Sequence, residues 1–160
     1  MEITTPETTA VDELADCWSE LAADQRQYGS RLLADENRQA VTDTIARHIV
    51  NDGLLVARED EAIRGFVMYK IEDGRYIQDT TTGVIVNLYV RPAARDEGVG
   101  SELLAAAETA LAEAGVETVT LEVLAANDDA RRFYQRAGYR PHRVELAKRI
   151  ENDTHSKGGD

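Results

Sequence analysis

The stretch VIVNLYVRPAARDEGVG, residues 84–100, decides the fold: an apolar run ends at Pro92, and Arg95, Gly98 and Gly100 follow in the spacing R-x-x-G-x-G. The apolar run predicts a buried strand, and the glycines predict a tight turn that leads directly into a helix. The next residues, SELLAAAETALAEAG, repeat apolar side chains at helical spacing and stop at Gly115. A strand, a glycine turn and a helix therefore stand at the centre of the fold.

A helix that begins in this way offers a binding site for phosphate. Its first backbone N–H groups have no partner within the helix, and the positive end of the helix dipole lies beside them. Two common phosphate loops do not fit this stretch. The pattern G-x-x-x-x-G-K-[ST] is missing, and Leu103 stands where a dinucleotide-binding loop has its third glycine. The turn predicts an anion site of another kind.

These residues resemble the cofactor loop of the Gcn5-related N-acetyltransferase (GNAT) family, which reads [QR]-x-x-G-x-[GA] after a strand of the form L-x-V-x-P. The chain has the matching residues at Leu88, Val90, Pro92, Arg95, Gly98 and Gly100. A second family pattern, N-x-x-A-x-x-x-Y-x-x-x-G-[FY], is matched by Asn127, Ala130, Tyr134, Gly138 and Tyr139. The two motifs stand in the family's order and cover about residues 84–139.

The resemblance implies an α/β (α+β) fold, in which a mixed, mostly antiparallel central sheet splays in a V and is flanked by about four helices. The periodicity predicts a short strand at Ile3, a helix near residues 11–22 capped by Thr9 or Asp12, a helix over residues 36–49, and strands at LLVA, IRGFVMYKI and TVTLEVLAAN. We predict a single domain over residues 1–150. Residues 151–160, ENDTHSKGGD, have no apolar side chain and predict a disordered tail.

The resemblance also implies that acetyl-CoA lies in the opening of the V as a co-substrate, held largely by backbone groups. The residues implied are Leu88, Tyr89, Val90, Arg95, Asp96, Glu97, Gly98, Val99, Gly100, Ser101, Asn127 and Tyr134. Arg95 is either a charge partner of phosphate or a solvated surface arginine. Asn127 either binds the pantetheine arm or caps the following helix. Asp96 and Glu97 replace the glycine and the lysine or glutamine of the commonest family loop, and they add negative charge there.

The implied reaction is direct attack of a primary amine on an acetyl thioester in a ternary complex. An alkylamine has a pKa of about 10.4, so a base or a chain of waters must take its proton, and the thiolate gains from a proton donor. Tyr134 is the donor that the resemblance implies, although its helical position equally suits a core aromatic. Glu122 is the candidate base, and the alternatives are an ordinary outward-facing charge at this position and a proton path through water.

The strand before the loop, VIVNLYV, contains no glutamate that could serve as the base. Alternation of side chains along this strand predicts Asn87 on the same face as Ile85 and Tyr89. An asparagine can orient a water molecule but cannot accept a proton at neutral pH.

The composition is strongly acidic, with a net charge of -12 and only three lysines among 18 basic residues. This predicts either adaptation to a salt-rich cytoplasm, as in halophilic proteins, or an acidic surface that attracts cationic amines. The sequence has no basic patch with interleaved aromatic residues, so we do not expect it to bind nucleic acid directly. The sequence shows neither a start like a signal peptide nor an apolar stretch long enough to span a membrane. We therefore expect a cytoplasmic protein. Cys17 is expected in the core, and the histidines show no metal-ligand spacing, so no metal is expected.

The sequence thus predicts an N-acetyltransferase that transfers acetyl from acetyl-CoA to a primary amine of a small molecule or a protein. One alternative is a non-catalytic module that binds acetyl-CoA as a sensor. Another is a structural interaction domain whose cofactor site has decayed. The identity of the amine and the formation of a homodimer stay open.

Overall fold

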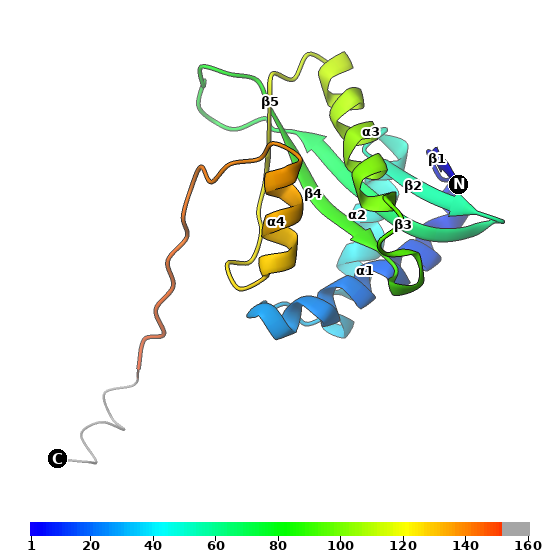
Figure 1. The fold of residues 1–160 in the computed structure, drawn as a ribbon, viewed down its shortest axis with the longest axis horizontal. Helices are drawn as coiled ribbons and strands as arrows, with labels where there is room; N and C mark the ends of the chain where they lie inside the picture. Colours follow the sequence, from blue (N-terminus) through cyan, green and yellow to red (C-terminus); the bar gives the residue numbers. More distant parts are fainter. Residues whose placement is uncertain (152–160) are drawn as a thin grey trace.

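The computed structural model describes residues 1–151, and its strands form one five-stranded sheet in the order β1-β2-β3-β4-β5. The strands are β1 (Glu2–Thr4), β2 (Leu54–Glu59), β3 (Ala62–Ile71), β4 (Thr82–Val90) and β5 (Thr118–Leu121). Neighbours from β1 to β4 are antiparallel, whereas β5 runs parallel to β4. The predicted mixed, mostly antiparallel sheet is confirmed (Figure 1).

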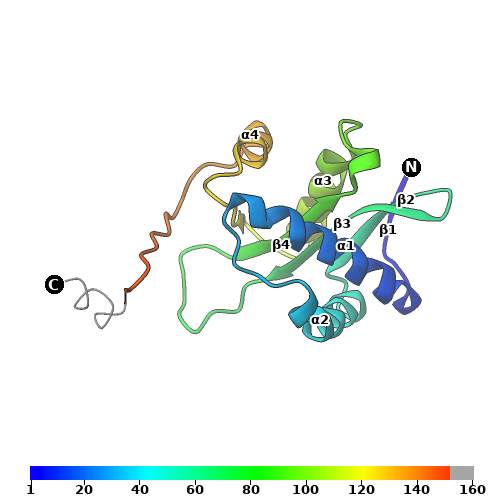
Figure 2. The same ribbon diagram turned by 90° about the horizontal axis from the view of Figure 1, so that it is seen from below.

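Helices cover both faces of the sheet, as Figure 2 shows. The helices are α1 (Val11–Gln25), α2 (Arg38–Val50), α3 (Val99–Glu113) and α4 (Asp128–Arg136). The first two lie on one face, and α3 and α4 lie on the other. No helix within residues 1–151 has the length and apolar character needed to cross a bilayer.

The predicted cap of the first helix was wrong. The residue before α1 is Ala10, and no side chain there accepts a hydrogen bond from the helix. A 3-10 turn over Thr8–Ala10 leads directly into α1, so its backbone bonds take the place of a side-chain cap. Neither Thr9 nor Asp12 is therefore needed to begin the helix.

Two apolar layers form the core, one on each face of the sheet. The layer beneath α1 and α2 contains Leu14, Cys17, Trp18, Ile45, Phe66 and Tyr89, among others. The layer beneath α3 contains Val67, Ile85, Leu103, Leu104 and Leu111, with Phe133, Tyr134 and Tyr139 packed against its margin. Cys17 is fully buried, and burial raises the pKa of its thiol to about 11. The prediction that Cys17 is a core residue is confirmed.

A bulge divides β4 into two halves. Two consecutive residues of β3 pair with Asn87 and Ile85, so Val86 is an extra residue in the strand. Ile85 packs in the layer beneath α3, whereas Tyr89 packs in the layer beneath α1. The predicted common face for Ile85, Asn87 and Tyr89 was therefore wrong, because the extra residue reverses the alternation between the two halves.

The sheet splays between β4 and β5. Residues Thr82–Ile85 of β4 pair with Thr118–Leu121, but β4 continues to Val90 after β5 has ended. The joined end has further contacts, because the Thr80 and Thr118 hydroxyls lie 2.7 Å apart and the Glu117 N–H donates to the Thr81 carbonyl at 2.9 Å. This geometry gives the predicted V, with its open end at Val90.

After α4 the described chain forms no further helix or strand. Residues 140–151 lead away from the rest of the molecule, in orange to red in Figure 1. The tail predicted over residues 151–160 lies, apart from residue 151, outside the described residues.

Candidate functional site

A row of free backbone amides lies at the open end of the splay, where the loop after β4 enters α3. Gly98 stands before the helix with a φ of 80°, and no side chain caps the helix. The first bond of the helix runs from the Glu102 N–H to the Gly98 carbonyl, at 3.1 Å. Within residues 1–151, the amides of Val99, Gly100 and Ser101 have no hydrogen-bond partner. An anion at this helix start would accept hydrogen bonds from these three groups.

The backbone of this loop explains which positions favour glycine. A Cβ atom added at Gly98 would meet no heavy atom within 4 Å, so its left-handed conformation is the constraint there. Asp96 also has a left-handed backbone, with a φ of 65°. The commonest family loop has glycine where this chain has Asp96, and the conformation gives the physical reason. Aspartate is one of the few other residues that tolerate it.

Arg95 lies against the end of β4. Its Nε donates to the Val90 carbonyl at 3.0 Å, and its guanidinium carbon is 5.6 Å from the centre of the Tyr89 ring. The side chain is exposed, and no carboxylate of the described residues lies within ion-pair distance of it. The guanidinium thus lies at the end of β4, in the loop that leads to the amide row, and keeps donors for an anion.

Tyr134 projects from α4 on the same side of the sheet as α3. It is half-buried, and its ring packs edge-to-face on Phe133 and on Tyr139, with centroids 5.1 and 5.9 Å away. Burial raises the pKa of Tyr134 to about 12, so the phenol stays protonated at neutral pH. Its hydroxyl makes no hydrogen bond within the described part of the chain. Tyr134 therefore packs as an aromatic and also offers a free proton donor.

Asn127 and Glu122, two further predicted site residues, lie in different environments. Asn127 caps α4, because its Oδ1 accepts a hydrogen bond from the Ala130 N–H at 3.1 Å. Glu122 follows β5 directly and is exposed, with no ion pair to the rest of residues 1–151. The capping role of Asn127 is confirmed, while its contact with a ligand and the role of Glu122 as a base stay predictions.

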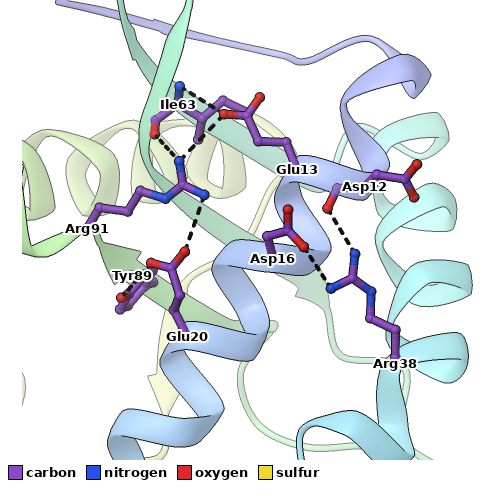
Figure 3. A network of polar contacts seen from close by, with 8 residues as sticks. All are labelled: Asp12, Glu13, Asp16, Glu20, Arg38, Ile63, Tyr89 and Arg91. Atoms are coloured by element: carbon purple, nitrogen blue, oxygen red, sulfur yellow. Dashed lines mark hydrogen bonds and ion pairs between the residues drawn. The ribbon is translucent and has the colours of Figure 1, made fainter.

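A polar network on the opposite face was missed by sequence reasoning (Figure 3). Arg91 lies 3.3 Å from the Glu20 carboxylate and 3.6 Å from that of Glu13, and Glu20 also accepts a hydrogen bond from the Tyr89 hydroxyl at 3.1 Å. Burial and the nearby Glu20 raise the pKa of Tyr89 to about 12. These contacts join α1 to the end of β4, directly before the loop that leads into α3.

One signal in the sequence could have revealed this network. Glu13, Asp16 and Glu20 recur at helical spacing and form an acidic stripe along α1. Asp16 pairs with Arg38 of α2 at 2.8 Å, so the stripe connects α1 to two different elements. Its basic partners are far away in the sequence and follow no periodic pattern.

The sheet, the free amides and the half-buried phenol define an α/β protein with a candidate ligand site where two parallel strands, β4 and β5, stop pairing. No cluster of three or more metal-binding side chains occurs within residues 1–151. A sequence model of the Acetyltransferase (GNAT) family matches residues 11–139. The chain belongs to this family, and membership supports acetyl transfer as its general activity.

The relatives agree with this family. An aminoalkylphosphonate N-acetyltransferase of Salmonella typhimurium is 38% identical over 68 residues, which are 42% of this chain and 44% of that protein. The match thus spans less than half of that relative. A protein of Bacillus halodurans shares the fold with a TM-score of 0.79 at 18% identity, covering 94% of this chain and all of that one. An acetyltransferase of Clostridium acetobutylicum with acetyl-CoA has a TM-score of 0.75 at 16% identity, covering 92% and 95% of the two chains.

Proposed function

We propose that the protein is an N-acetyltransferase that transfers acetyl from acetyl-CoA to a primary amine by direct attack in a ternary complex. The observation that carries the proposal is the row of unpaired amides at the start of α3, which lies at the open end of the splay between β4 and β5. The family match and the Clostridium structure with acetyl-CoA support the identity of the co-substrate. The proposed catalytic unit is residues 1–150.

The loop residues fit a pyrophosphate group. The N–H groups of Val99, Gly100 and Ser101 supply donors, and Arg95, in the loop before them, supplies positive charge. A Cβ atom at Gly100 would lie 3.4 Å from Phe133, so the start of α3 lies in contact distance of α4. The half of β4 that extends beyond Ile85 has no strand beside it on the β5 side, so its backbone can pair with the pantetheine arm.

The proton transfers follow from the groups around the opening. Acetyl-CoA supplies an activated acetyl group, which forms a new bond to the amine nitrogen while the carbon–sulfur bond breaks. Tyr134 donates a proton to the sulfur, because its raised pKa keeps the phenol protonated. The proton of the amine leaves to Glu122 or to water. The products are an amide and the free thiol of CoA.

The substrate class is proposed as small aminoalkyl compounds, with amines of proteins as the second class. The Salmonella relative carries aminoalkylphosphonate in its name, and its match to this chain is the reason to screen such compounds first. The acidic composition, with a net charge of -12, favours cationic amines over anionic compounds, so aminoalkyl compounds without a phosphonate group belong in the same screen.

The substitution Tyr134→Phe tests the proposal. It removes the donor but keeps the aromatic packing, so we expect kcat to fall about tenfold or more while the Kd for acetyl-CoA stays unchanged. Tyr139→Phe is the matched control. Its ring packs on the same tyrosine, but its hydroxyl donates to Glu108 at 2.6 Å and has no proposed part in catalysis.

The alternatives predict different results in the same assays. Acetyl-CoA binding without turnover of any amine would favour a sensor. A folded protein that binds no acetyl-CoA, in dilute buffer or in molar KCl, would favour a structural domain with a decayed site. Equal kcat values for the wild-type protein and Tyr134→Phe would remove Tyr134 from the mechanism.

A further inference from the structure

Val90 is the last residue of β4, and its backbone groups point to the side where no strand pairs with it. The Arg91 N–H donates to the Arg64 carbonyl at 2.8 Å, so these two residues form a hydrogen-bonded pair. Val90 stands opposite Gly65, one position along the same register. Bonded and non-bonded pairs alternate in an antiparallel ladder, so the N–H and C=O groups of Val90 point away from β3, toward the side of β5.

The same alternation applies to Leu88, which stands opposite Val67. Pairing between β4 and β5 ends at Ile85 and Leu121. Within residues 1–151, no strand therefore covers Leu88 or Val90 on this side. We call the outer edge of β4 at these two residues the open edge, and it is where the pantetheine arm of the proposed co-substrate would pair.

One side chain already occupies the open edge. The Nε of Arg95 donates to the Val90 carbonyl at 3.0 Å. A strand paired with β4 would lie about 4.8 Å away, and its N–H group would come within about 3 Å of the same oxygen. The guanidinium of Arg95 therefore lies in the space that a pantetheine amide would enter.

The contacts that hold Arg95 in this place are ones that a phosphate can replace. Its guanidinium carbon is 5.6 Å from the centre of the Tyr89 ring, and the Tyr89 hydroxyl donates to Glu20 at 3.1 Å, which fixes the ring. Among residues 1–151, no carboxylate lies within ion-pair distance of Arg95. A phosphate oxygen carries a negative charge, which the Val90 carbonyl does not, so it is the stronger acceptor for a guanidinium.

We propose that Arg95 makes the protein select thioesters by their phosphate groups, an inference that rests on the proposed function. Without phosphate, Arg95 blocks the open edge at Val90. A pyrophosphate at the amide row attracts the guanidinium away, and the Val90 carbonyl then accepts a hydrogen bond from the pantetheine arm. A thioester of pantetheine alone brings no phosphate, so it has to displace Arg95 unaided and binds weakly.

Calorimetry with two thioesters tests this selection. Acetyl-CoA and acetylpantetheine carry the same acetylated arm, but only the first carries phosphates. We expect Arg95→Ala to raise the Kd for acetyl-CoA about tenfold and to lower the Kd for acetylpantetheine about threefold, because the open edge is then free. Arg47→Ala is the control. It removes the same charge from an exposed position on α2, on the opposite face of the sheet, and both Kd values are expected to stay unchanged.

Inorganic pyrophosphate gives a second measurement on the unmodified protein. If the anion draws Arg95 away from Val90, saturating pyrophosphate is expected to lower the Kd for acetylpantetheine about threefold. The same addition to Arg95→Ala is expected to leave this Kd unchanged. An arginine that stays on Val90 would give no coupling in either protein, which would contradict the proposal.

The outcomes separate this inference from the proposed function. If Arg95→Ala binds acetylpantetheine no more tightly than the wild-type protein, or if neither binds it at millimolar concentration, the selection by Arg95 is wrong. Acetyl-CoA binding by the wild-type protein would then still support the proposed function. A folded wild-type protein that binds no acetyl-CoA would overturn both. Circular dichroism shows whether Arg95→Ala folds, and Arg95→Met, which keeps an aliphatic stem, replaces it if it does not.

Discussion

At the scale of single residues, the loop before α3 contains a measurable conformational cost at Asp96. Its φ of 65° suits glycine best and aspartate better than alanine. We expect Asp96→Ala to lower the free energy of unfolding by about 1 kcal/mol relative to Asp96→Gly. Both changes remove the same charge, so urea denaturation of the two variants isolates the backbone effect. Equal stabilities would mean that the backbone is not left-handed in solution.

Gly65 lies in close contact with the backbone at the end of β4. A Cβ atom at this position would lie 2.5 Å from the Tyr89 carbonyl, which is backbone and cannot give way easily. We expect Gly65→Ala to destabilise the protein by about 1 to 3 kcal/mol. Gly74→Ala is the control, because an added Cβ there would meet nothing within 4 Å. Thermal unfolding of both variants measures the difference, and similar midpoints would contradict the close approach.

The half-buried phenol of Tyr134 predicts a loss of stability in alkaline solution. Its pKa rises from 10.0 to about 12, so the folded state holds this proton more tightly than the unfolded state. The free energy of unfolding is therefore expected to fall as the pH rises from about 10 to about 12. Tyr134→Phe should make this fall less steep. If the two proteins show the same alkaline slope, Tyr134 is not buried in solution.

The sequence predicted the structural placement of those candidate site residues that belong to a local motif. The glycine turn and Tyr134 both belong to such motifs, and the structure places them on the elements expected. The polar network of Arg91 with Glu13 and Glu20 was not predicted. Contacts between side chains distant in sequence depend on how α1 packs on the sheet.

At the scale of elements, this polar network connects α1 to the end of β4. Arg91→Ala would leave two carboxylates, Glu13 and Glu20, close together without their shared cation. We expect a loss of about 1 kcal/mol, reduced at high salt, and weaker acetyl-CoA binding because the loop follows Arg91 directly. Arg38→Ala breaks the pair between α1 and α2 and is the control, with binding expected to stay unchanged. Unchanged acetyl-CoA binding in both variants would show that the polar network does not position the loop.

Most helices and strands were predicted within about one turn, but two features of the strands were not. The run VIVNLYV is almost uniformly apolar, so it has no alternation that could reveal the extra residue at Val86. The strand predicted at TVTLEVLAAN ends at Leu121, because pairing with β4 stops there. Both features depend on a neighbouring strand, which local sequence does not specify.

At the scale of the whole molecule, the net charge of -12 predicts an unusual response to salt. Asp96 and Glu97 lie beside the proposed pyrophosphate site, and repulsion of about 1 kcal/mol in water is screened within about 3 Å at 1 M salt. We expect acetyl-CoA to bind more tightly in molar KCl than in dilute buffer. Glu97→Gln should reduce this difference. Calorimetry measures both, and an affinity that falls steadily with KCl would contradict the prediction.

The joining of β4 and β5 at one end only has a mechanical consequence. From Ile85 to Val90, over about 16 Å, β4 stays paired with β3 but has no strand on its β5 side, so the two parallel strands are held together at one end alone. The contacts of Thr80 with Thr118 and of Glu117 with Thr81 hold the two strands together at this end. We expect substitutions at this joined end to change how far β4 and β5 diverge, although these residues lie away from the amide row at the start of α3.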